Sequence, residues 1–349
     1  MFKKILSVVT LVLVAVIIYA ARDSLISSLD YISHLNVWVL LFLIPEQLYM
    51  YYAAGQMYFA YLRAKGNAKI SSWKLMRVSL EINFMNHIIP SGGVAGLGYL
   101  VWRLKEWQIS AGQATFMHIL RYAIAAITTT VQMWVAMAIL AVMGLLPWQM
   151  FGLGSLTCLG IEAVAIAVFV IIMSKKRIDW FSKVAATLSN RFIRWITRGR
   201  KRKVLDEQKV DKYFTDLHGG WLVARKKKRM LVYPYLWGTI YSFLEAATFW
   251  VVAAALGHPE IMPQIMLGQG MASIVGTLLA TPGGIGGFEG AMIFVLVATG
   301  VPVEVATITV IVTRVILLLG TIVSGWGFYQ HALLSKKASG GPKSGKSNA

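Results

Sequence analysis

Long apolar runs separated by short polar segments are the main feature of this chain of 349 residues. The runs cover residues 5–21, 37–62, 113–144, 153–173, 231–257, 261–280 and 303–331. Each run is long enough to cross about 30 Å of hydrocarbon as a helix. Because lipid offers no hydrogen-bond partner to an open backbone, such spans must be helical. The pattern therefore predicts an all-α, polytopic membrane protein with about seven or eight transmembrane spans.

Two apolar regions are interrupted by a similar segment rich in proline and glycine. The first interruption contains Pro90, Gly92 and Gly93, and the second contains Pro282, Gly283, Gly284, Gly286 and Gly287. Helix breakers at membrane depth are tolerated only where protein or a water-filled cavity covers the free backbone. A matching break in both halves points to a transport site between inverted repeats. The glycines can also expose N–H groups to an anion at the start of a half-helix. The pattern favours a transporter or a lipid flippase.

The distribution of charge predicts how the chain is oriented in the membrane. The net charge is +19, and Arg22 is the only basic residue left in an outer loop when the other basic clusters are placed in the cytoplasm. The positive-inside rule then puts both termini in the cytoplasm. We expect an inner-membrane protein that does not bind nucleic acid. The single cysteine, Cys158, excludes an intramolecular disulfide and a cysteine metal cluster.

The same charge argument predicts two hairpins that dip into the membrane from opposite faces. The spans alternate only if segment 75–111 leaves from and returns to the cytoplasm, and segment 261–300 begins and ends outside. This is an inverted-topology arrangement. A full crossing within 261–300 satisfies the charges equally well. We expect the chain to consist of a first membrane half over 1–173, a basic cytoplasmic segment over 174–230, a second membrane half over 231–334 and a disordered tail over 335–349.

The basic segment 174–230 carries 18 Lys and Arg residues against five Asp and Glu residues. Between Ile178 and Ile196 its apolar positions recur at three- and four-residue steps. This spacing is typical of an amphipathic helix that lies among lipid headgroups and is attracted to anionic lipid. A cytoplasmic linker that obeys the positive-inside rule is the other interpretation.

In the second half, Arg314 and Glu289 are the main candidates for substrate contact. Arg314 lies about 16 Å into its span at the helical rise, near the midplane. An arginine there costs roughly 2.5–3.5 kcal/mol on insertion scales, so it should face a partner or water. Glu289 follows the second break and is its expected partner. Either the two form a permanent bridge, or the arginine grips a substrate phosphate through its forked donors.

In the first half, polar residues gather immediately before Pro90. Glu81 is expected to pair with Arg121, while Asn86 and His87 are expected to cap broken backbone. His87 is either a hydrogen-bonded packing residue or a proton sensor. Weaker candidates elsewhere in the spans are Glu46, Glu162 and Glu245.

Soluble active-site motifs are missing from the sequence. It contains no phosphate-binding loop, no His-Glu metal motif and no nucleophile elbow. We therefore expect a translocator rather than an enzyme, without a metal or another cofactor.

Residues 281–289, which read Thr-Pro-Gly-Gly-Ile-Gly-Gly-Phe-Glu, carry a family resemblance. They closely resemble the signature of the lysylphosphatidylglycerol synthetase transmembrane family, also called flippase-like domain proteins. Residues 89–93, with Arg121 downstream, resemble its first-half pattern. The family includes the membrane half of the bacterial multiple peptide resistance factor, which moves aminoacylated phosphatidylglycerol to the outer leaflet. This chain stops soon after its last span, so we expect the soluble synthase domain of that factor to be absent.

The resemblance implies a flippase or scramblase for an anionic or aminoacylated phospholipid, or for a lipid-linked headgroup. Two other hypotheses stay open. One is a proton-coupled transporter of a small anion, working through Glu289 or His87. The other is a membrane scaffold whose basic segment recruits a soluble lipid-modifying enzyme. Anionic phospholipids are the expected partners, and the sequence leaves the oligomeric state open, a homo-oligomer included.

Overall fold

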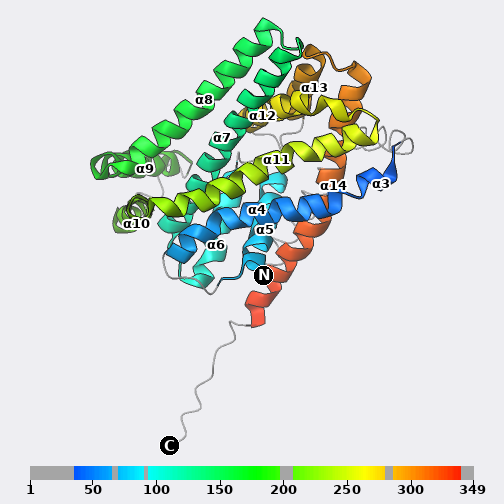
Figure 1. The fold of residues 1–349 in the computed structure, drawn as a ribbon. Coiled ribbons are helices and arrows are strands. Elements are labelled where there is room, and N and C mark those ends of the chain that lie inside the picture. The colour runs from blue at the N-terminus through cyan, green and yellow to red at the C-terminus, as the bar shows by residue number, and fades with distance from the viewer. Residues whose placement is uncertain (1–34, 65–69, 90–92, 197–206, 280–285, 339–349) are drawn as a thin grey trace, which may run out of the picture.

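The computed structural model describes residues 35–64, 70–89, 93–196, 207–279 and 286–338, and every regular element in these ranges is a helix (Figure 1). Five helices in this part of the chain are long and apolar enough to cross a membrane. The expectation of an all-α polytopic membrane protein is therefore confirmed. The first apolar run, 5–21, lies outside the described residues. Segment 261–280 forms a helix of 18 residues that is not among the five.

The five long stretches are the framework of the fold. They comprise α3 (Val37–Leu40) with α4 (Leu43–Ala64), α7 (Ala111–Val142), α8 (Trp148–Met173), α11 (Val232–Ala255) and α14 (Val303–Ala338). Ser110 caps α7 in a capping box with Gln113, and Pro147 precedes α8. Helix α14 continues to Ala338, into the segment that the sequence predicted as a tail from 335. Residues 335–338, which read Ser-Lys-Lys-Ala, include lysine and alanine, which are good helix formers.

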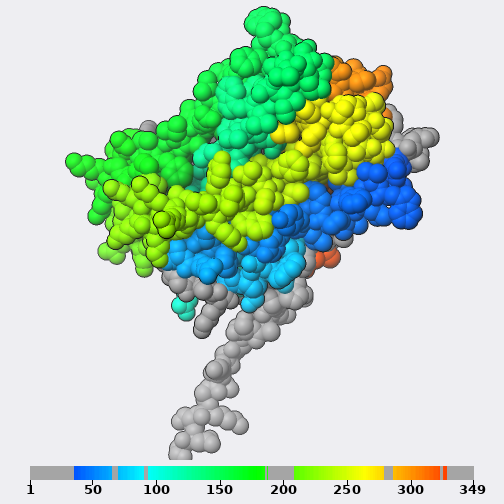
Figure 2. All heavy atoms as spheres, viewed as in Figure 1, coloured from blue at the N-terminus to red at the C-terminus, as the bar shows by residue number. Residues whose placement is uncertain are grey.

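Helices α4 and α11 pack along each other and lie side by side across the face shown in Figure 1. Helix α5 (Ser72–Ile88) crosses α4 so closely that a Cβ atom at Gly55 would lie 2.7 Å from the backbone nitrogen of Met76. Only glycine permits this approach. Figure 2 shows the side chains of α4 and α11 across the middle of this face. Large apolar side chains such as Trp38 and Phe42 are exposed in this region, as expected where lipid is the solvent.

Each half contains a pair of short helices on either side of a break. The first pair is α5 and α6 (Val94–Leu104), and the second is α12 (Met262–Leu279) and α13 (Gly287–Ala298). The two members of each pair pack against each other. Helix α7 packs against α6 and α12, whereas α14 packs against α13 and α5. Each long helix that follows a break therefore contacts its own pair and the first helix of the other pair.

The two largest clusters of buried apolar side chains are centred on different halves. The largest cluster is built mainly from α4, α5, α6 and α7, with additions from α8, α9 and α10. A second cluster draws on α11, α12, α13 and α14. Two smaller clusters join the halves: one combines α7 and α8 with α12 and α13, and the other combines α4 with α11 and α14.

The basic segment between the halves is helical over most of its described length. It contains α9 (Lys175–Ile196), α10 (Glu207–Lys226) and the short η2 helix (Lys228–Leu231). In α9, Ile178 is buried while Trp180 and Phe181 are exposed. Helix α10 packs against α7, where Gly112 and Gly220 leave room for Tyr213 and Phe116. The basic segment therefore packs against the membrane helices through α10.

Candidate translocation site

Arg314 and Glu289 lie together at the start of the second half-helix. The Arg314 Nε atom is 2.7 Å from Oε1 of Glu289, and their side chains are only 18% and 13% exposed. The other carboxylate oxygen, Oε2, accepts a hydrogen bond of 2.7 Å from the backbone N–H of Gly286. One carboxylate thus caps α13 and neutralises an arginine from α14.

Arg314 also contacts an aromatic ring of α13. Its guanidinium group lies 4.6 Å from the centre of the Phe288 ring, a cation–π distance. Phe288 in turn stacks on Phe249 of α11, with ring centres 5.7 Å apart. The charge of Arg314 also acts on His87 at the end of α5. His87 itself bonds through Nδ1 to the carbonyl of Asn83, 2.9 Å away. Arg314 therefore lies within electrostatic reach of both broken hairpins.

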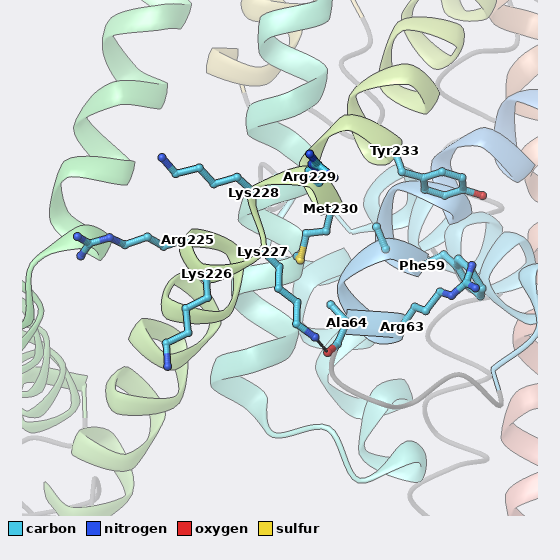
Figure 3. A pocket seen from close by; sticks show the side chains of 11 residues that line it. Phe59, Arg63, Ala64, Arg225, Lys226, Lys227, Lys228, Arg229, Met230 and Tyr233 are labelled. Carbon is cyan, nitrogen blue, oxygen red and sulfur yellow. Dashed lines mark hydrogen bonds between the residues drawn. The ribbon is translucent and has the colours of Figure 1, made fainter.

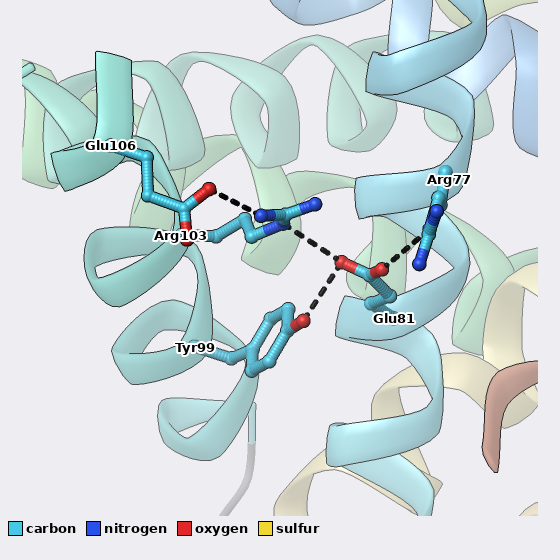
Figure 4. A network of polar contacts seen from close by, with 5 residues as sticks. All are labelled: Arg77, Glu81, Tyr99, Arg103 and Glu106. Atoms are coloured by element: carbon cyan, nitrogen blue, oxygen red, sulfur yellow. Dashed lines mark hydrogen bonds and ion pairs between the residues drawn. The ribbon is translucent and has the colours of Figure 1, made fainter. Parts of the chain in front are cut away.

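Glu81 in the first half is bound inside its own hairpin (Figure 4). Its fully buried carboxylate is 3.0 Å from Nε of Arg77 and 3.4 Å from Nε of Arg103, and it accepts a hydrogen bond of 2.8 Å from Tyr99. Arg103 also pairs with Glu106. The expected pair of Glu81 with Arg121 is therefore wrong. Helix α6 folds back along α5 and brings Arg103 to Glu81, while Arg77 lies one turn earlier on α5.

Each half-helix starts from a glycine with positive φ. The N-cap of α6 is Gly93, with φ at 91°, and the N-cap of α13 is Gly286, with φ at 89°. Asn86 accepts a hydrogen bond of 2.8 Å from the N–H of Gly96, so it caps α6 from the preceding helix. Five predicted residues lie outside the described part of the chain: Pro90, Gly92, Pro282, Gly283 and Gly284. Gly287 is the first residue of α13.

Arg121 lies among tyrosines instead of next to Glu81. It donates a hydrogen bond of 3.3 Å to the hydroxyl of Tyr58. Its guanidinium carbon is 5.5 or 5.6 Å from the ring centres of Tyr58, Tyr122 and Tyr241. No carboxylate among the described residues forms a salt bridge with it. Cation–π contacts therefore hold this charge in the interior, and its charge is not neutralised by direct contact.

Glu245 extends the tyrosine cluster toward the second half. Tyr241 donates a hydrogen bond of 3.2 Å to Oε1 of Glu245, and Gln269 of α12 donates one of 2.9 Å to Oε2. A chain of polar contacts thus runs from Arg121 through Tyr241 and Glu245 to Gln269, across α7, α11 and α12. Glu245 was only a weaker candidate by sequence, and the tyrosines and Gln269 were not candidates at all. The four-residue step from Tyr241 to Glu245 on one helix face was the available signal.

A second acidic contact joins α4 to α11. Thr248 donates a hydrogen bond of 3.2 Å to Glu46, and Gln47 donates hydrogen bonds of 2.9 Å to both Glu46 and Thr248. These contacts satisfy the polar groups of two long helices where they cross. No cluster of three metal-binding side chains occurs among the described residues. The two candidate arginines differ in what holds them: Arg314 is paired with a carboxylate, and Arg121 is held by aromatic rings.

Comparison with known proteins gives one match. The family model described as the lysylphosphatidylglycerol synthase TM region matches residues 5–325, which is most of the chain. No curated protein and no solved structure matches the chain.

Proposed function

The chain belongs to the lysylphosphatidylglycerol synthase TM family, and from this premise we propose that it moves phospholipid between the leaflets of the cell membrane. The family match supports a lipid-related, flippase-like role in a membrane. The proposed substrate is an anionic or aminoacylated phospholipid, or a lipid-linked headgroup. The proposed orientation has both termini in the cytoplasm, from the distribution of basic residues.

The position of Arg314 is the observation that carries this proposal. It reaches Glu289 of one broken hairpin at 2.7 Å and acts electrostatically on His87 of the other. A guanidinium group can bind two phosphate oxygens in a forked geometry, and it stays charged. In the proposed cycle the headgroup phosphate displaces Glu289 from Arg314 while the lipid tails stay in the bilayer. The carboxylate then returns when the headgroup leaves.

The arrangement of helices supports an alternating mechanism. In each half, a long helix follows a break, packs on its own hairpin and reaches the first helix of the other hairpin. We propose that these halves are inverted repeats that rock against each other, as in other transporters with broken helices. Arg121 on α7 would then be the first-half counterpart of Arg314 on α14. Its charge, held only by tyrosines, is the second proposed contact for phosphate.

A liposome assay tests this function. Purified protein is reconstituted with fluorescent phosphatidylglycerol in both leaflets, and a membrane-impermeant reductant bleaches the label that it can reach. Translocation is expected to expose inner-leaflet label, so wild-type vesicles should bleach further than protein-free vesicles. We expect Arg314→Ala to abolish this excess, because the phosphate would lose its forked partner at the centre of the path.

The control is Arg177→Ala, which removes an arginine at the surface of α9 and should transport like the wild type. Equal bleaching by wild type and Arg314→Ala would overturn the assignment of Arg314. A pH gradient that drives uptake of a soluble anion, without any lipid bleaching, would instead favour the proton-coupled transporter.

A further inference from the structure

A strongly basic cavity lies apart from the Arg314 site, where the end of α4 meets the end of α10 and the start of α11 (Figure 3). Its volume is about 820 Å³, in the range of sites that hold small molecules. The cations that line it are Arg63, Arg225, Lys226, Lys227, Lys228 and Arg229. In Figure 3 their side chains spread out from the turn between α10 and α11 and from the last turn of α4.

Among the described residues, no acidic side chain neutralises these cations. The lining contains no Asp or Glu. Lys227 donates a hydrogen bond of 3.0 Å to the carbonyl of Ala64, at the C-terminal end of α4. None of the other five forms an ion pair with a carboxylate among the described residues. So many unpaired cations around one space repel each other, and a bound anion would relieve that repulsion.

One wall of the cavity is aromatic and leads along the membrane helices. The rings of Phe59 and Tyr233 are 6.4 Å apart, and Tyr233 is 6.1 Å from Trp237. Trp237 in turn contacts Tyr49 and Tyr52 of α4, at 6.1 and 5.5 Å. Of these, Tyr233 and Tyr49 are more than a third exposed. Tyrosine and tryptophan of this kind mark the boundary between headgroups and hydrocarbon.

We propose that this cavity binds the phosphate headgroup of an anionic phospholipid. The positive charge of this cluster would attract the phosphate, and the aromatic row from Phe59 to Tyr49 would lie against the glycerol and the acyl chains. The shared chemistry is a phosphate anion, which a soluble phosphate compound also offers. The aromatic row along the apolar spans favours the lipid, because a soluble anion has no acyl chains that would contact it. Bound lipid would join α10 to α4 and fix the basic segment at the membrane surface. This site does not depend on the proposed translocation.

Lipid binding to the full chain in detergent provides the test, measured by native mass spectrometry. The probes are phosphatidylglycerol, phosphatidylcholine with the same acyl chains, and inorganic pyrophosphate. The test variant is Lys226→Gln/Lys228→Gln/Arg229→Gln, which spares the contact of Lys227 with α4. The control variant is Lys175→Gln/Lys176→Gln/Lys212→Gln, which removes the same charge from exposed positions of α9 and α10.

The wild type should prefer phosphatidylglycerol to phosphatidylcholine, and the test variant should bind phosphatidylglycerol about tenfold more weakly. The control variant should stay within about twofold of the wild type. Because these side chains are at the surface, both variants should give the helical circular dichroism of the wild type. A charge-keeping variant, Lys226→Arg/Lys228→Arg, should retain binding even if the glutamine variant folds poorly. Arg314→Ala should also retain binding, which separates this site from the transport proposal.

Three outcomes would overturn the proposal. Equal losses in the test and control variants would show that net charge alone attracts the lipid. Equal affinity for phosphatidylglycerol and phosphatidylcholine would remove the role of the anionic headgroup. Pyrophosphate that binds as tightly as phosphatidylglycerol, and displaces it, would assign the cavity to a soluble phosphate compound.

Discussion

The two broken hairpins are built alike but are held in opposite ways. Both half-helices begin after a glycine with φ near +90°. Three residues later, α6 has Gly96, whose N–H is bound by Asn86 from the preceding helix. At the same position, α13 has Glu289, whose carboxylate reaches back to the N–H of Gly286. The first half-helix is capped by its neighbour in the hairpin, and the second caps itself.

The acidic residues of the two hairpins extend this difference. Glu81 is bound by Arg77, Tyr99 and Arg103, all within α5 and α6. Glu289 is bound by Arg314, which comes from α14 outside the hairpin. The acid of the first hairpin is therefore bound within the hairpin itself. The acid of the second is bound by a separate helix, so we expect this ion pair to change during the proposed transport while the contacts of Glu81 stay intact.

The largest expected effect is the loss of stability when Glu81 is removed. Glu81→Ala would leave two arginines close together and without their buried carboxylate. We expect the free energy of unfolding to fall by about 3–5 kcal/mol, measured by reversible unfolding in mixed micelles. Glu81→Gln keeps an acceptor for the hydroxyl of Tyr99, so its free energy of unfolding should fall by less than that of Glu81→Ala. A value near that of the wild type for Glu81→Ala would show that the first hairpin is not held by this cluster.

The two cap glycines should respond alike, because both have positive φ. Gly93→Ala and Gly286→Ala should each cost roughly 1–2 kcal/mol of unfolding free energy, since an L side chain is strained in this conformation. Among the described residues, neither position has a neighbour closer than 4.0 Å to the added Cβ atom, so backbone strain is the expected cost. Gly98→Ala, inside α6 and also unobstructed, is the matched control and should not destabilise. Different costs at Gly93 and Gly286 would contradict the similarity of the two breaks.

Removing the acid of the second hairpin should affect the substrate more than the fold. In Glu289→Gln, Arg314 has no carboxylate to compete with phosphate. We expect phosphatidylglycerol to bind at the Arg314 site about tenfold more tightly, or about 1.4 kcal/mol, while liposome transport falls because release is slowed. Glu304→Gln, at an exposed position in the first turn of α14, should change neither quantity. Unchanged binding in Glu289→Gln would favour a permanent structural bridge.

The smallest effects should come from two further glycines and should have opposite signs. A Cβ atom at Gly96 would overlap the side chain of Asn86 and break the cap. Gly96→Ala should therefore lose about 1 kcal/mol. Gly290 in α13 has nothing within 4 Å, so Gly290→Ala should gain about 0.5 kcal/mol from the better helix propensity of alanine. Both changes in stability are measured as shifts of the unfolding midpoint. The same sign for both would contradict the two modes of capping.

The sequence was informative wherever local spacing or the cost of burial in lipid decided the answer. Apolar runs predicted α7, α8, α11 and α14 because a membrane span must be apolar and helical over a fixed length. The sequence also predicted the pairing of Arg314 with Glu289, because a charge inside the membrane needs a partner and Glu289 lies at the start of α13, just after the second break. The positions of the two breaks could be predicted directly from the two segments rich in proline and glycine.

The rest depended on which helices touch, and that cannot be read from one helix at a time. Arg121 has two of its three tyrosine partners on α4 and α11, far away in the chain, so the sequence alone wrongly suggested Glu81. The basic cavity likewise combines Arg63 with residues from 225 to 229, which only the packing of α4 against α11 brings together. The sequence by itself determined that the chain is a helical membrane protein with two breaks and buried charges. The tertiary structure decided which charges meet, because helix packing and not position in the chain sets the distance between their side chains.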